Sequence, residues 1–212
     1  MEKGSVPLVG VLISGRGSNL QALVAAIDEG RLRARIAVVI SNAANAEGLA
    51  VARGARIETL VLPHPAHASR DAYDRALGGA LAERRVQLGC LAGFMRLLGA
   101  AFCDSFPSAV LNIHPSLLPS FPGTNAHRQA IDHGVKVSGA TVHLVSPELD
   151  AGPIVAQRAV PVLDGDTPDT LAARILAVEH ELYPGAVERI LWEPWTVVGR
   201  RVVFGSDAEA VR

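Results

Sequence analysis

Residues 8–20, which read LVGVLISGRGSNL, indicate the fold class most directly. The apolar run from Leu8 to Ser14 is typical of a strand buried on both faces of a parallel sheet. A loop with two glycines follows at once, and apolar residues then recur at helical spacing until Gly30. A strand, a glycine loop and a helix in this order predict an α/β fold.

The glycine loop, Gly15 to Asn19, also predicts a phosphate site. Glycines let the backbone approach an anion, and the free N–H groups of a helix N-terminus favour negative charge. A tight turn without a ligand is the alternative. A dinucleotide fingerprint fits poorly, because Leu20 takes the place of its third glycine and the next strand, near 36–40, ends in Ser41-Asn42 without a carboxylate.

A second decisive stretch is VLNIHPSLLP at residues 110–119. Alternate residues of a strand share a face, so Asn112 and His114 are predicted to point the same way. Pro115 holds His114 extended and ends the strand. Open α/β sheets bind ligands at this carboxyl end of their strands, which makes His114 a candidate catalyst; a structural, hydrogen-bonded histidine is the alternative.

The rest of the sequence continues to alternate between predicted strands and predicted helices. We expect an open, mostly parallel, doubly wound sheet with a Rossmann-like N-terminal half and an antiparallel strand and helix part at the C-terminal end. Further helices are predicted at 46–53, 69–84 and 125–133 and from Thr167 to a meeting with Pro184; further strands are predicted at 57–62, 87–92, 138–145 and 154–162, with a hairpin at 196–204.

Composition excludes several functional classes. The formal net charge of −1 gives no basic footprint for nucleic acid. The two cysteines are too few for a disulfide framework or a four-cysteine metal site, and the proline-rich loop around His64 and His67 favours solvated side chains over metal ligands. No apolar run reaches the roughly 20 residues of a membrane helix, and the N-terminus does not read as a signal peptide. We therefore expect a cytoplasmic protein that binds no membrane and no metal.

Two other pieces are candidates for ligand contact. Arg70 stands at the predicted start of a helix, where a cation gains nothing from the dipole, so it either faces solvent or serves an anionic ligand. Residues 93–98, GFMRLL, follow a strand and would line a pocket for a flat ligand or simply pack in the core.

Four blocks taken together resemble a known family: residues 8–20, LAGFMR at 91–96, NIHPSLLP at 112–119 and DAGPI at 150–154. They resemble the folate-dependent glycinamide ribonucleotide formyltransferases of purine biosynthesis. The resemblance implies formyl transfer from 10-formyltetrahydrofolate to the amine of 5-phosphoribosylglycinamide. It also implies small-molecule partners only, no metal, and a monomer or homodimer.

The resemblance further implies the site residues. The catalytic set is Asn112, His114 and Asp150; Asn112 and protonated His114 stabilise the oxyanion, and Asp150 keeps His114 cationic. Ribonucleotide contacts are implied for Gly17, Ser18, Asn19 and Glu179, and folate contacts for Arg70, Met95, Arg96, Leu97, Leu98, Asn112, Ser146, Pro147, Glu148, Leu149 and Asp150. We expect a single formyltransferase domain over 1–212, with a phosphate-binding half of about 1–110, a folate and catalytic half of about 111–205, and a frayed tail at 206–212.

Related families give the alternatives. Methionyl-tRNA formyltransferases share the Pro-Ser-Leu-Leu-Pro block but carry a further C-terminal domain and need a basic surface. Formyltetrahydrofolate hydrolases carry an extra N-terminal domain, whereas the first strand here is expected from about Leu8. A non-catalytic phosphate sensor would use the glycine loop but leave Asn112, His114 and Asp150 without a purpose. Arg16 replaces the small polar residue usual in the family, and either attracts phosphate or points outward.

Overall fold

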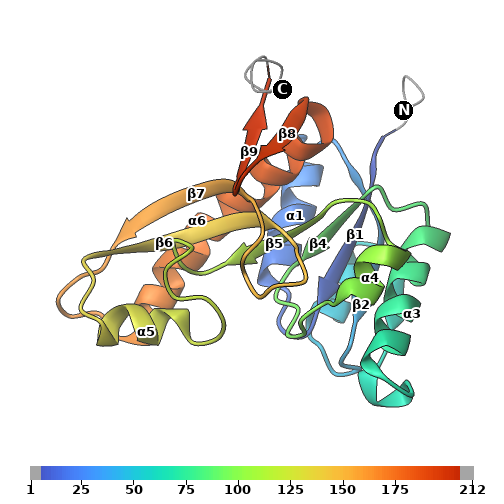
Figure 1. The fold of residues 1–212 in the computed structure, drawn as a ribbon, viewed down its shortest axis with the longest axis horizontal. Coiled ribbons are helices and arrows are strands. Elements are labelled where there is room, and N and C mark those ends of the chain that lie inside the picture. Colours follow the sequence, from blue (N-terminus) through green and yellow to red (C-terminus); the bar gives the residue numbers. More distant parts are fainter. Residues whose placement is uncertain (1–5, 206–212) are drawn as a thin grey trace. The chain divides into compact units, whose positions relative to one another are not determined.

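The structure, a computed structural model, describes residues 6–205. The chain divides into two compact units, Met1–Leu111 and Asn112–Arg212 (Figure 1). The tail expected to fray, 206–212, lies outside the described residues.

The first unit is a parallel α/β layer. Its strands lie in the order β3-β2-β1-β4, and every neighbouring pair is parallel. Their bounds are β1 Leu8–Ile13, β2 Arg35–Ser41, β3 Thr59–Val61 and β4 Leu88–Leu91. Val11, Leu12 and Val39 are fully buried, as parallel strands covered on both faces require. The Rossmann-like half predicted from the sequence is therefore confirmed.

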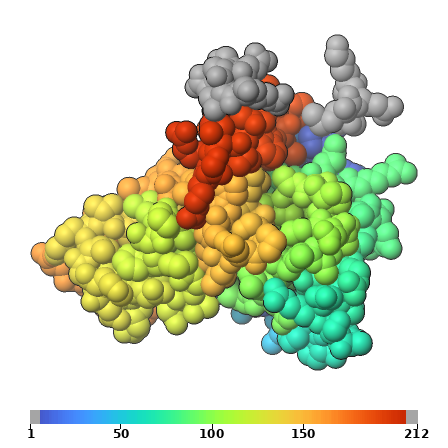
Figure 2. Space-filling model, in the orientation of Figure 1, coloured from blue at the N-terminus to red at the C-terminus, as the bar shows by residue number. Residues whose placement is uncertain are grey.

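The helices of this unit are α1 Ser18–Asp28, α2 Gly48–Gly54, α3 Arg70–Glu83 and α4 Ala100–Ser105, with a 3₁₀ turn, η1, at His64–Ala66. Helix α1 packs with α2, and α3 lies beside α4 (Figure 1). The segment from α3 to α4 forms much of this unit's face in Figure 2. The sequence did not predict helix α4, because six residues are too few to show a helical periodicity. The helix packs closely on α3: a Cβ added at Gly78 of α3 would collide with Ser105 of α4.

Strand β5, Val110–His114, carries the chain from the first unit into the second. In the second unit β6, Val137–Leu144, pairs antiparallel with β7, Ile154–Pro161. Strand β7 meets β9, Arg201–Phe204, in parallel, and β9 forms an antiparallel hairpin with β8, Trp195–Val198. The predicted hairpin and antiparallel C-terminal part are thus confirmed.

Two helices complete the second unit, α5 Ala126–Asp132 and α6 Pro168–Trp192. Thr167 caps α6 in a capping box with Thr170. The helix does not end on meeting Pro184 but continues for two turns, with Ala186, Val187 and Ile190 buried. Proline inside a helix costs about 3 kcal/mol, and burying a few large apolar side chains at about 1.5–3 kcal/mol each outweighs that cost. Among residues 6–205 no helix is long and apolar enough to cross a membrane.

Candidate active site

The glycine loop of the first unit joins β1 to α1. Gly17 is the N-cap of α1 and has φ 76°, a left-handed conformation that favours glycine. No side chain caps this helix, and its first turn holds no acidic residue. The N-terminus of α1 therefore presents backbone N–H groups and the positive end of a dipole, as an anion site requires.

A second glycine, Gly48, explains why position 17 tolerates no side chain. The N–H of Gly48, at the start of α2, donates to the carbonyl of Gly15 at 3.0 Å. A Cβ added at Gly17 would lie 2.7 Å from the Cα of Gly48, closer than Cβ contacts occur. Gly17 is thus required by the packing of the loop on α2 as well as by its own backbone conformation.

The apolar loop 93–98 lies against the end of β1 in the same unit. The N–H of Ser14 donates to Gly93, and the Ser14 hydroxyl accepts from the N–H of Met95 at 2.8 Å. Met95 and Leu97 are 73% and 41% exposed, whereas Leu98 is 2% exposed and belongs to the core. Large exposed apolar side chains beside a glycine loop suit a flat ligand, and the folate contacts implied for this loop stay predictions.

Two arginines have contacts at this loop: Arg70 binds to it, and Arg96 belongs to it. Arg70 donates through Nη2 to the Leu97 carbonyl at 2.9 Å, so it does not simply face solvent. The Arg96 guanidinium lies 5.3 Å from the centre of the Tyr73 ring. Burial raises the pKa of Tyr73 to about 12, although Arg96 acts in the opposite direction. Both cations are therefore held in place, at a position where an anionic group could meet them.

In the second unit His114 ends β5 and is 4% exposed. Its Nε2 lies 2.9 Å from the carbonyl oxygen of Phe121, and because a carbonyl only accepts, Nε2 carries the hydrogen. Its Nδ1 lies 3.4 Å from Oδ2 of Asp150. Both ring nitrogens thus face oxygen atoms, and only the imidazolium form can donate to both.

Asp150 is held by backbone contacts. It has φ 49°, a left-handed conformation that Asp tolerates, and its side chain is 9% exposed. Its Oδ2 accepts from the N–H of Gly123 at 2.7 Å, a charge-assisted hydrogen bond. The carboxylate is therefore aimed at His114 by the loop around Gly123, 27 residues away in the sequence.

Asn112 is joined to the same cluster by His143 of β6. The Asn112 Nδ2 lies 3.1 Å from Nε2 of His143, and His143 Nδ1 lies 2.9 Å from the Leu144 carbonyl. Nε2 of His143 is also 3.7 Å from Oδ1 of Asp150. Burial, the largest cause, lowers the pKa of His143; the Leu144 carbonyl and Asp150 act in the opposite direction. The three side chains predicted as catalytic thus converge within one unit, together with a histidine to which the sequence assigned no role.

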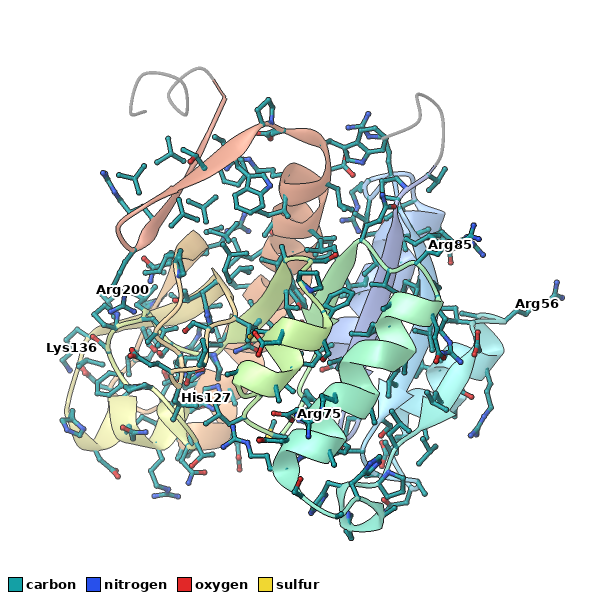
Figure 3. All side chains as sticks on the ribbon, turned by 45° about the vertical axis from the view of Figure 1, so that its right-hand side comes forward. Arg56, Arg75, Arg85, His127, Lys136 and Arg200 are labelled. Atoms are coloured by element: carbon teal, nitrogen blue, oxygen red, sulfur yellow. The ribbon has the colours of Figure 1, made fainter. Side chains whose placement is uncertain are left out.

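A further histidine lies near this cluster. His127, in the first turn of α5, is labelled in Figure 3. Its pKa is lowered first by burial and then by the neighbouring charge of His114. Nothing in the local sequence marks this residue, because its proximity to His114 depends on how the loop before α5 folds back.

The substrate contacts implied for Glu179 and for residues 146–149 stay predictions. Glu179 is buried on α6 at 6% exposure. In the loop after β6, the Ser146 hydroxyl donates to the Glu148 carbonyl, and Leu149 is 55% exposed. His64 and His67 contact the Tyr73 ring edge-on, and among residues 6–205 no three metal-ligating side chains gather.

Comparison with known proteins identifies the family of this chain. The formyl transferase family matches residues 8–187. The chain is 46% identical to phosphoribosylglycinamide formyltransferase of Escherichia coli K12 over 174 residues, which is 82% of each chain. It is 48% identical to the trifunctional purine biosynthetic protein adenosine-3 of Bos taurus over 182 residues, 86% of this chain but only 18% of the bovine one. The crystal structure of glycinamide ribonucleotide transformylase 1 from Symbiobacterium toebii superimposes with a TM-score of 0.92 at 50% identity, covering 95% of both chains. The chain belongs to the formyl transferase family.

Proposed function

We propose that this chain transfers the formyl group of 10-formyltetrahydrofolate to the amine of 5-phosphoribosylglycinamide, giving formylglycinamide ribonucleotide and tetrahydrofolate. The observation that carries the proposal is the convergence of Asn112, His114 and Asp150 in the second unit. The acceptor is proposed because relatives are named as phosphoribosylglycinamide formyltransferase and glycinamide ribonucleotide transformylase. The formyl group is proposed because the chain belongs to the formyl transferase family.

The reaction makes an amide and needs three things: a neutral amine, a polarised formyl carbonyl and an acceptor for a proton. The glycinamide amine has a pKa of about 8, as an α-amino group does, so a useful neutral fraction exists near pH 7. When the amine attacks the formyl carbon, the carbonyl oxygen gains negative charge. The protein must supply donors at that oxygen.

His114 is suited to donate through Nδ1. Its Nε2–H is occupied by the Phe121 carbonyl at 2.9 Å, which fixes the plane of the ring. The 3.4 Å between Nδ1 and Asp150 is longer than a tight charge-assisted bond, so the Nδ1–H is free to share an oxyanion placed beside it. Hydrogen bonds of this kind tighten only in the transition state, where they lower the barrier.

Asn112 supplies the second donor, because an amide nitrogen has two hydrogens and His143 takes one of them. Each such donor contributes about 3 kcal/mol to transition-state stabilisation. Asp150 has two roles in this proposal: its carboxylate lies 3.4 Å from Nδ1 of His114 and orients the ring, and it accepts the amine proton on the way to the departing folate nitrogen.

Each of the two units contributes contacts with both substrates in this proposal. In the first unit the loop Gly17–Asn19 binds the ribonucleotide phosphate at the N-terminus of α1, and Arg70 and residues 95–98 contact the folate. In the second unit Glu179 contacts the ribonucleotide and residues 146–150 contact the folate. No metal takes part in these steps, and the protein acts in the cytoplasm.

A steady-state assay tests the proposal. The purified chain is given 10-formyltetrahydrofolate with and without 5-phosphoribosylglycinamide, and both tetrahydrofolate and the formylated ribonucleotide are measured. We expect tetrahydrofolate only when the ribonucleotide is present, in equal amount to the second product. Tetrahydrofolate formed with water alone would identify a hydrolase, and formylation of methionyl-tRNA in its place would identify a different acceptor.

A further inference from the structure

The orientation of the Asn112 amide is decided by its neighbours. Nδ1 of His143 lies 2.9 Å from the Leu144 carbonyl, which only accepts, so Nδ1 carries a hydrogen. A neutral ring then has a bare lone pair at Nε2. The atom of Asn112 that faces Nε2 at 3.1 Å must therefore be the donor Nδ2 and not the acceptor Oδ1.

We propose that His143 is a positioning residue, whose neutral ring holds the amide of Asn112 with one N–H directed to His143 and the other available to the formyl oxygen. This inference rests on the proposed formyl transfer. It assigns His143 no contact with the substrate; the residue acts through Asn112.

Three features of the structure keep His143 in this state. The side chain is 4% exposed, and burial disfavours its charged form. Gly152 leaves room for the Leu144 carbonyl, which a Cβ at that position would strike. The charged groups around the ring oppose one another: Asp150 favours protonation, whereas His114 and Arg200, at the turn between β8 and β9 (Figure 3), disfavour it.

Protonation of His143 would reverse the amide. A hydrogen on Nε2 cannot face the Asn112 NH₂ group, so the amide must turn and present its oxygen to the ring. The amide oxygen and nitrogen then exchange places, which moves the donor away from its position at the formyl oxygen. Turnover should therefore fall as His143 takes up a proton, without a matching change in substrate binding.

The first test reads the ring directly in the full chain. Long-range proton–nitrogen NMR of the ¹⁵N-histidine-labelled protein, with His143→Gln used to assign the signal, reports which ring nitrogen carries hydrogen at pH 7. We expect a neutral ring with hydrogen on Nδ1. A hydrogen on Nε2, or a doubly protonated ring at this pH, would overturn the proposal whether or not the protein transfers formyl groups.

The second test compares two substitutions. Gln places an oxygen near the Nε2 position and does not titrate, so His143→Gln should retain most of kcat. His143→Leu has no acceptor, and we expect kcat to fall roughly 10- to 100-fold with KM nearly unchanged, less than the loss of the donor itself. His180→Gln, which replaces a partly buried histidine whose pKa is also lowered by burial, is the matched control and should leave kcat unchanged.

Two comparisons separate positioning from general stability. In an Asn112→Ala background, His143→Leu should cause no further loss, because the residue through which it acts is gone. The ratio of wild-type kcat to that of His143→Gln should fall toward acid pH, since only the wild type can be protonated there. An undiminished loss in the Asn112→Ala background, or a ratio independent of pH, would reject the inference. An inactive wild-type protein would instead reject the proposed function.

Discussion

In the first unit the functional loop consists of backbone: Gly17 stands at φ 76° against Gly48, and the groups offered to an anion are N–H groups of α1. In the second unit the functional groups are side chains, with Asp150 and His114 held 3.4 Å apart by loop carbonyl and N–H groups. The first arrangement is sensitive to a carbon atom added at Gly17, whereas the second is sensitive to the loss of one charge. Substitutions in the glycine loop should therefore affect binding, and substitutions of Asp150 and His114 should affect turnover.

The largest effect is expected for Asp150→Asn. Asn tolerates the left-handed backbone at this position, so the protein should fold, but the charge beside His114 and the proton acceptor are both lost. We expect kcat to fall on the order of 10³-fold or more. Steady-state kinetics measure this loss, and circular dichroism with thermal unfolding checks the fold. A kcat within a few-fold of the wild type at every pH would remove Asp150 from the mechanism.

His114→Asn should have the next largest effect. Asn keeps a neutral donor but no positive charge, so kcat should fall about 10²-fold, the cost of weakening one oxyanion donor. KM should change little, because the interaction matters only when the formyl oxygen carries charge. Direct titration of ribonucleotide binding provides the control. If this substitution abolished binding in a folded protein, His114 would be a ligand anchor rather than a catalyst.

A pair of glycine substitutions tests the backbone site. Gly17→Ala forces a Cβ into a left-handed residue and to within 2.7 Å of the Cα of Gly48, whereas a Cβ at Gly15 has nothing within 4 Å. We expect Gly17→Ala to raise KM for the ribonucleotide about tenfold, which is about 1.4 kcal/mol, with little change in KM for the folate. Gly15→Ala is the matched control. Equal increases in both Michaelis constants would indicate a general loss of structure.

The smallest effect is expected on the free energy of unfolding as a function of pH. Three histidines with lowered pKa values lie in the second unit: His127, His143 and His180. Their folded pKa values lie below the ordinary 6.5, so the unfolded chain binds more protons as pH falls through 6.5. The free energy of unfolding should be flat above this value and decrease below it. Urea unfolding from pH 8 to about pH 5 measures the slope.

A variant sharpens the pH experiment. His180→Gln removes one partly buried histidine with a lowered pKa from the second unit, so the unfolding free energy of the variant should depend less steeply on pH below 6.5 than that of the wild type. This substitution should change the free energy of unfolding and leave kcat unchanged. A steeper dependence in the variant would show that His180 is protonated in the folded protein.

Much of the fold could be predicted because strands and helices leave a local periodicity in the sequence. The run 8–13, the cap at Thr167 and the hairpin around Gly199 are each specified by neighbouring residues. Helix α4 and the continuation of α6 past Pro184 could not be predicted, because both depend on burial against other elements. In each case tertiary packing outweighs a weak or unfavourable local preference.

The sequence by itself determined that Asn112 and His114 share a face, because alternation along a strand is a local property. It also determined, by resemblance, that Asp150 joins them. Only the tertiary structure decided what holds these groups: the Phe121 carbonyl on His114, the Gly123 N–H on Asp150 and His143 on Asn112. The physical reason is that two of these partners are backbone groups, which are the same in every residue and become specific only when the chain folds them into place.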